Sequence, residues 1–161
     1  MPLSTIDHLG RRGENIAFVR LTEVCQVNDL PYFVPHFLGD KCPLFDALVE
    51  LVGAGSKTPY FFAQVKATRE GCNTRGRLKV KVEKSDVIGL VQYPAPTYVI
   101  GIDEVHEKAY VVAVYGNMDK KISSLNTAHE LNPATLKLLW VEVRDYWKDK
   151  DMTRKKSHFT N

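Results

Sequence analysis

Apolar residues recur with a helical period at the start of the chain and form strand-like runs after it. The spacing over residues 5–26 predicts an amphipathic helix, with Ser4 or Thr5 as its N-cap. Three apolar runs follow, at 32–37, 45–52 and 60–68, and predict strands. The short glycine-rich segment between the last two runs predicts that they pair as a hairpin.

The second half of the chain continues with alternating strand and helix patterns. Residues 69–78 predict a basic loop, 79–82 alternate like a strand, and 85–92 predict a short helix. Runs at 97–103 and 109–115 predict a second hairpin, and Asn132-Pro133 begins a helix over about 132–149. Residues 116–131 have an ambiguous pattern. The length suits one domain over 1–150, with a core at about 5–115 and a loose basic tail at 151–161.

The composition is that of a folded, mildly basic protein. Of its 161 residues 44% are hydrophobic, and 22 Lys and Arg against 19 Asp and Glu give a net charge of +3, which permits nucleic-acid binding without requiring it. Three cysteines without Cys-x-x-Cys spacing argue against a disulfide framework or a zinc ribbon. The start lacks the apolar core of a signal peptide, and no apolar run is long enough to cross a bilayer. We therefore expect a cytoplasmic protein without a membrane partner.

Polar side chains of the first predicted hairpin gather on one face of the sheet. Side chains alternate along a strand, so Asp46 lies on the face opposite to Phe45 and the alternate apolar residues after it, while Gln64 and Lys66 share a face. If the hairpin closes symmetrically about Ser56, Asp46 lies opposite Lys66 and Gln64 lies diagonal to Asp46, at roughly 7 to 8 Å between α-carbons. These side chains could then converge on one cation. An ordinary amphipathic sheet would give the same alternation.

Glu14 is the charged member of an otherwise small or apolar stripe on the first predicted helix. The stripe has helical spacing and consists of Gly10, Glu14, Ala17, Leu21 and Val24. A carboxylate that faces a core needs a partner or a metal, because burying an unpaired charge is costly. The alternative to a metal is a salt bridge from Glu14 to Lys66 or to an arginine.

Together these residues resemble the PD-(D/E)XK nuclease superfamily. The resemblance rests on Gly10-Arg11-Arg12-Gly13-Glu14 on a helix, Asp46 on a strand and Gln64-Val65-Lys66 on the next strand. More narrowly, the chain is similar to small domains allied to Mrr-type restriction enzymes and archaeal Holliday-junction resolvases. The resemblance covers about residues 9–115. It implies a restriction-endonuclease-like α/β fold with three layers, in which helices flank a central mixed sheet in an αβββαβ core, here with an additional C-terminal helix.

The resemblance also implies a metal-dependent DNA endonuclease, in phage defence, restriction or DNA repair. Asp46, the Gln64 side chain, the backbone carbonyl of Val65 and Glu14 would bind Mg²⁺, with Mn²⁺ as a substitute. Lys66 would stabilise the negative charge that develops as metal-activated water attacks the phosphodiester. Hard Mg²⁺ prefers oxygen ligands, lowers the pKa of bound water and neutralises charge on the phosphate.

Two features depart from the family pattern. Gln64 stands where many members have an acidic residue, so a neutral amide replaces an anionic ligand and metal affinity should fall. The approach to the aspartate, Cys42-Pro43-Leu44-Phe45-Asp46, lacks the glycine common among relatives. The first departure motivates an alternative function, in which a catalytically weakened nuclease fold binds nucleic acid or a partner protein.

Basic residues near these positions predict contacts with the DNA backbone. They are Arg11, Arg12, Arg69, Arg75, Arg77, Lys79 and Lys81. A solvated surface is the alternative for each of them, and no helix-turn-helix or zinc-finger pattern suggests base-specific binding. Aromatic residues on the last predicted helix (Trp140, Tyr146 and Trp147) suit either the internal core or an interface, so we also expect a homodimer or membership of a multi-protein system.

Overall fold

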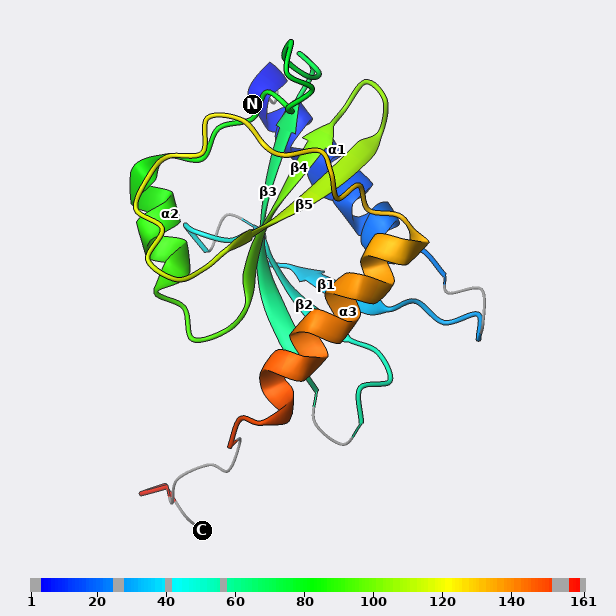
Figure 1. The fold of residues 1–161 in the computed structure, drawn as a ribbon, viewed down its shortest axis with the longest axis vertical. Helices are drawn as coiled ribbons and strands as arrows, with labels where there is room; N and C mark the ends of the chain where they lie inside the picture. The colour runs from blue at the N-terminus through cyan, green and yellow to red at the C-terminus, as the bar shows by residue number, and fades with distance from the viewer. Residues whose placement is uncertain (1–3, 25–27, 40–41, 56–57, 152–156, 160–161) are drawn as a thin grey trace.

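The protein has an α/β fold with three layers, in which helices cover both faces of a five-stranded mixed sheet (Figure 1). A computed structural model describes residues 4–24, 28–39, 42–55, 58–151 and 157–159. The elements are α1 (Thr5–Leu21), β1 (Phe33–Phe37), β2 (Ala47–Leu51), β3 (Tyr60–Thr68), α2 (Lys84–Val91), β4 (Thr97–Asp103), β5 (Lys108–Val114) and α3 (Pro133–Lys148). This order confirms the predicted αβββαβ core with an additional C-terminal helix.

The strands lie in the order β1-β2-β3-β4-β5 across the sheet. All neighbours pair antiparallel except β3 and β4, which pair parallel through a crossover that contains α2. Because these two strands run the same way, their carboxyl ends meet at one edge of the sheet, where Thr68 pairs with Asp103. Side chains at the end of β3 therefore lie next to the turn that joins β4 to β5.

Each face of the sheet has its own apolar core. Helices α1 and α3 pack on one face, around buried residues such as Phe33 and Ile100. The other face is covered by α2 and by two extended segments, 78–82 and 122–125, which join through the bridges Leu78–Leu125 and Val82–Ile122. These segments contact β4 directly, since a Cβ added to Gly101 would lie 2.7 Å from Leu125 and 2.9 Å from Leu78.

Two predicted elements have different bounds or character in the structure. The first helix ends at Leu21 rather than at residue 26, because the Thr22 hydroxyl and N–H both bond the Phe18 carbonyl and Val24 bridges to Pro31 as the chain turns toward β1. Residues 25–27 lie outside the described residues. The run 79–82 has the predicted alternation of exposed and buried residues, yet it joins the fold through isolated bridges and not as a strand of the main sheet. The predicted tail lies mostly outside the described residues.

Helix α3 is anchored to the hairpin of β2 and β3 by its two tryptophans. Asn132 caps the helix by accepting the Thr135 N–H, and Pro133 takes the first helical position. The indole N–H groups of Trp140 and Trp147 donate to the carbonyls of Val52 and Tyr60 at 2.9 and 2.8 Å. In the part of the chain that is described, no helix has the length and apolar character needed to cross a bilayer.

Candidate metal and phosphate site

A bulge at the start of β2 moves Asp46 out of the regular ladder. Ala47 is the register partner of Ala63, yet the Asp46 N–H also donates to the Ala63 carbonyl at 2.8 Å, so two residues oppose one. The predicted pairing of Asp46 with Lys66 was wrong. Glu50 pairs with Tyr60, which displaces the register by two residues from closure about Ser56, itself outside the described residues. The displacement follows from closure of the hairpin by the bond from Leu51 N–H to the Pro59 carbonyl.

The bulge also changes the face on which Phe45 lies. Phe45 stacks on Phe62, with ring centroids 4.1 Å apart, in the core beside α2. Ala47, by contrast, belongs to the core beside α1 and α3. The prediction that these two residues share one apolar face was therefore wrong, because an extra residue in a strand shifts the alternation of side chains beyond it.

The carboxylate of Asp46 takes the place of a backbone carbonyl at the edge of β3. Its Oδ2 accepts the Val65 N–H at 2.6 Å, while its own backbone carbonyl accepts the Leu38 N–H at 2.9 Å. Burial raises the pKa of Asp46, and the Val65 hydrogen bond and the charge of Lys66 act in the opposite direction. Since N–H and C=O of one strand residue point to the same side, the Val65 carbonyl also faces this edge.

Gln64 brings an oxygen without a partner into the same region. The side chain is only 4% exposed, and its Nε2 donates to the Leu44 carbonyl at 2.9 Å. Its Oε1 is buried and accepts no hydrogen bond within the described residues. A buried acceptor left unsatisfied costs about 1–3 kcal/mol, so this oxygen is suited to a ligand that supplies positive charge.

Lys66 lies on the same face of β3 as Gln64, because the two residues alternate with Val65. It pairs with Gly101 of β4, is half-buried, and has no ion pair among the described residues. Burial raises the pKa of Asp46, and the positive charge of Lys66 acts against this shift, as expected for a lysine near that carboxylate. The structure thus brings Asp46, Gln64 and Lys66 into one neighbourhood.

Glu14 approaches from the other side of the sheet. Its helix packs on β3 so closely that a Cβ added to Gly13 would lie 2.7 Å from the Ala67 Cβ. The buried face of α1 consists of Gly13, Ile16, Ala17 and Leu21. The predicted stripe was therefore displaced, and Glu14 is half-buried at the margin of the packed face. It shares a flank with Phe18, four residues on, whose ring lies 6.4 Å from that of Phe37, so this flank faces β1 and the Asp46 end of β2.

The predicted ligands are of the chemical types that Mg²⁺ binds. Within the described residues no three His, Cys, Asp or Glu side chains are arranged to hold a metal ion. The predicted set has only two carboxylates, from Asp46 and Glu14, and adds neutral oxygens from Gln64 and Val65. Mg²⁺ is commonly held by one or two carboxylates and keeps several waters, whereas zinc sites use Cys and His. Cys42 and Cys72 are free thiols, and Cys25 is outside the described residues.

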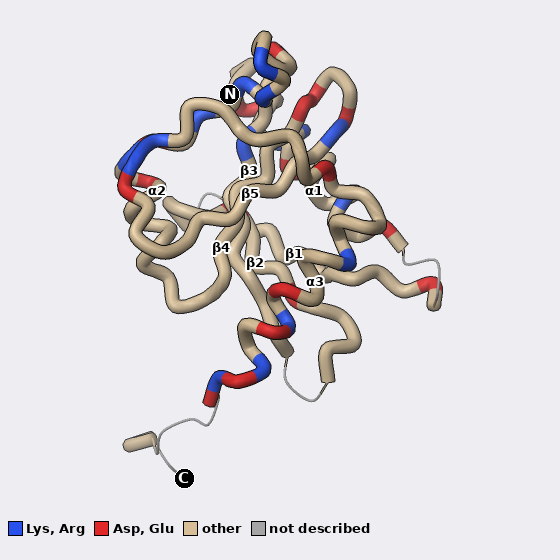
Figure 2. The backbone as a smooth tube through the Cα atoms, in the orientation of Figure 1, with Lys and Arg blue, Asp and Glu red and all other residues tan. Residues whose placement is uncertain are grey.

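The basic residues predicted to contact DNA fall into two groups. Four have internal partners: Arg12 with Glu104 and Glu107, Arg69 with Glu104, Lys79 with Glu70, and Arg77 with Ser124. Arg11, Arg75 and Lys81 are exposed and form no ion pair within the described residues. Figure 2 shows charged residues of both signs gathered around the edge of the sheet where β3 and β4 end.

Two groups that shape this region were not predicted from the sequence. Glu104, in the turn between β4 and β5, forms ion pairs with both Arg12 and Arg69. The Leu44 carbonyl holds the Gln64 amide. Both relationships join residues far apart in the chain, and no local pattern marks them. Glu50, by contrast, lies away from this region and pairs with His36 at 2.7 Å on the surface.

Comparisons of this chain with protein-family models, with curated proteins and with solved structures found no match. The functional assignment therefore rests on the residues of the chain itself.

Proposed function

We propose that this chain is a Mg²⁺-dependent DNA endonuclease that acts in the cytoplasm, in restriction, phage defence or DNA repair. The observation that carries the proposal is the buried Oε1 of Gln64, which has no hydrogen-bond partner among the described residues and lies on the strand beside the Asp46 carboxylate. Lys66 adds a positive charge on the same face as Gln64. Oxygen donors can hold a metal ion that activates water and polarises a phosphodiester, and a nearby ammonium group can stabilise the developing negative charge.

Each residue has a distinct role in this proposal. Asp46, Gln64, the Val65 carbonyl and Glu14 hold the ion, and the hydrogen bond from Val65 fixes the orientation of the Asp46 carboxylate. When bound, Mg²⁺ lowers the pKa of water and offsets the charge of the phosphate. Lys66 stabilises the negative charge that develops on the scissile phosphate, which is usually the largest catalytic contribution.

The decisive experiment is a cleavage assay on purified protein with supercoiled, linear, single-stranded and branched DNA, in Mg²⁺, Mn²⁺ or chelator. We expect cleavage that needs the metal and that Asp46→Asn and Lys66→Ala abolish. Glu50→Gln is the matched control. Glu50 lies on β2, the strand that begins directly after Asp46, but its carboxylate pairs with His36, so this variant should cleave DNA normally. Circular dichroism checks that each variant is folded. Cleavage retained in both site variants would refute the assignment.

A second candidate is a nuclease fold that binds DNA or a partner protein without cutting. The amide of Gln64 favours it, because its Nε2 bonds the Leu44 carbonyl and its oxygen is a weaker ligand than a carboxylate. Calorimetric titration separates the two functions. No binding of Mg²⁺ or Mn²⁺, even with DNA present, together with intact DNA affinity, would favour this module.

A homodimer would suit an enzyme that cuts both strands of a duplex, since most soluble oligomers have two-fold symmetry. The tryptophans of α3 are bonded to their own sheet, which leaves Tyr146 and Leu138 as its exposed apolar residues. Light scattering over a range of concentrations tests the dimer. A protein that stays monomeric at the highest concentration would rule out the homodimer.

A further inference from the structure

A polar hollow of about 560 Å³ lies between the first half of α1 and the end of β3. Its lining residues are Thr5, His8, Arg11, Arg12, Asn15 and Arg69. Three of the six carry a guanidinium group, and none is acidic or apolar. Such a lining is suited to an anion with several oxygens, because guanidinium groups bind phosphate through parallel N–H donors.

Glu104 holds two of these arginines side by side. Its Oε1 forms an ion pair with the Nε of Arg12 at 2.6 Å, and its Oε2 accepts a hydrogen bond from the Nε of Arg69 at 3.1 Å. The Glu104 side chain is 11% exposed, whereas the arginines are 49% and 50% exposed. One carboxylate therefore fixes the spacing of two cationic groups that come from a helix and a strand.

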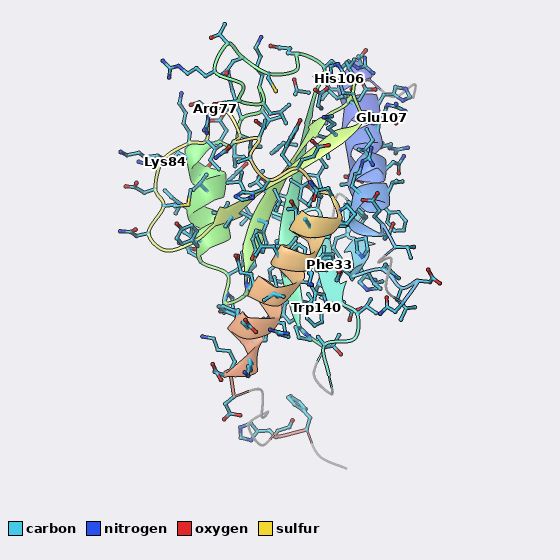
Figure 3. The ribbon with its side chains drawn as sticks, turned by 45° about the vertical axis from the view of Figure 1, so that its right-hand side comes forward. Phe33, Arg77, Lys84, His106, Glu107 and Trp140 are labelled. Carbon is cyan, nitrogen blue, oxygen red and sulfur yellow. The ribbon has the colours of Figure 1, made fainter. Side chains whose placement is uncertain are left out.

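The pairing with Glu104 leaves donors available for a ligand. The Glu107 carboxylate accepts a hydrogen bond from the Nη2 of Arg12 at 2.6 Å, and the Glu107 backbone carbonyl accepts from the Arg20 guanidinium. These contacts hold the turn between β4 and β5 against α1 (Figure 3). Within the described residues, neither Nη of Arg69 and no group of Arg11 takes part in an ion pair. A guanidinium has five N–H donors, of which the bond to Glu104 uses one in Arg69.

The hollow lies past the end of β3, on the side of the sheet that α1 covers, whereas Lys66 lies on the opposite face, where it pairs with Gly101. Arg69 follows Lys66 by three residues, which is about 10 Å along a strand. The close contact of Gly13 with Ala67 fixes α1 against β3 between them. A DNA backbone that passes around the end of β3 can therefore place one phosphate in the hollow and another, further along the same strand, near Lys66.

We propose that this hollow binds one phosphate group of the DNA backbone, and that Glu104 is a positioning residue for Arg12 and Arg69. The choice of DNA as the source of the phosphate rests on the proposed function. The hollow itself rests on its own contacts. A free phosphate ion shares the chemistry and is distinguished by the experiment.

The test compares two effects of opposite sign on the affinity for DNA. Replacing a carboxylate by an amide raises the net charge by one and, by general electrostatics, tightens DNA binding. Glu104→Gln should instead weaken binding, by about threefold or more, because the two arginines lose their common anchor. Glu70→Gln is the matched control, since Glu70 is exposed and only reaches Lys79 at 3.7 Å. It should bind as tightly as the original protein or more tightly.

Fluorescence anisotropy with a labelled oligonucleotide in EDTA measures the Kd without cleavage. Arg69→Ala should also reduce the slope of log K against log salt by about 1, and Arg69→Lys should bind more weakly although its charge is kept. Thermal unfolding shows whether each variant is folded. Folded Glu104→Gln and Arg69→Lys proteins that both bind like the original would overturn the proposal.

Inorganic phosphate, matched in ionic strength by chloride, identifies the source of the anion. Competition beyond that of chloride, lost in Arg69→Ala, would show that a lone phosphate suffices. Variant effects on DNA without such competition would assign the hollow to the DNA backbone. DNA binding that depends on Arg69, without any DNA cleavage, would refute the proposed nuclease function and support the phosphate site in the hollow. DNA cleavage, with variants that bind DNA normally, would support the nuclease function and refute the phosphate site.

Discussion

The Asp46 carboxylate accepts the backbone N–H of Val65 at 2.6 Å, and this bond joins the bulge of β2 to the open edge of β3. The same carboxylate is the acid in the proposed metal site. Its orientation is therefore set by the backbone of the central sheet and not by a mobile side chain. A ligand held in this way is ordered before the ion arrives, which favours binding.

Replacing Asp46 by asparagine should change how stability depends on pH. Burial raises the pKa of Asp46 above its ordinary value of 3.8, so the folded state holds this proton to higher pH than the unfolded chain does. In chelator, the original protein therefore loses stability as pH rises from 3.8 through the raised pKa. Asp46→Asn keeps an acceptor for Val65 and lacks this loss. Urea unfolding at about pH 4 and about pH 7 measures the difference; parallel changes in both proteins would contradict it.

Gln64→Glu should make folding stability depend on the metal. The substitution removes the donor to the Leu44 carbonyl and places a carboxylate at a position that is 4% exposed. In chelator the free energy of unfolding should fall by about 1–3 kcal/mol. Mg²⁺ or Mn²⁺ should restore it and bind more tightly than to the original protein, as calorimetry can measure. An unchanged Kd would show that the side chain at position 64 is not a ligand.

Two glycines of α1 should respond to alanine with opposite signs. The Cβ of Gly13→Ala would meet Ala67 at 2.7 Å and push α1 from β3, with an expected loss of about 1–3 kcal/mol. Gly10 has open space around it, so Gly10→Ala should gain about 1 kcal/mol from helix propensity. Chemical unfolding of the two variants tests the pair. Equal effects would mean that α1 is not seated on β3 as described.

Trp147→Phe should lower stability without changing the oligomeric state. It leaves the Tyr60 carbonyl without the indole donor, which costs about 1–3 kcal/mol. Tyr146→Phe is the control on the same helix. Its hydroxyl bonds Pro94 at 3.2 Å from an exposed position, and the expected change is within about 0.5 kcal/mol. A Trp147→Phe protein with unchanged stability but altered light scattering would place this residue in an interface.

The order of elements followed from local patterns, because helical and strand periods depend on near neighbours in the chain. The shared face of Gln64 and Lys66 followed from the same alternation of side chains. The bulge opposite Ala63 did not, since it depends on which residues face each other across two strands. One added residue was enough to move Phe45 to the other core. The ion pairs of Glu104 with Arg12 and Arg69 could not be predicted from the sequence either, because they join residues that lie far apart in the chain.

The two extended segments on the α2 face hold each other through contacts that neither can make alone. Arg77 donates to Ser124, Thr127 donates to the Gly76 carbonyl, and Leu78 bridges Leu125. Because opening of either segment breaks these shared contacts, we expect their amide protons to exchange with solvent together. Because both cover Gly101 of β4, the partner of Lys66, their joint opening would admit water to the central strand beside the lysine.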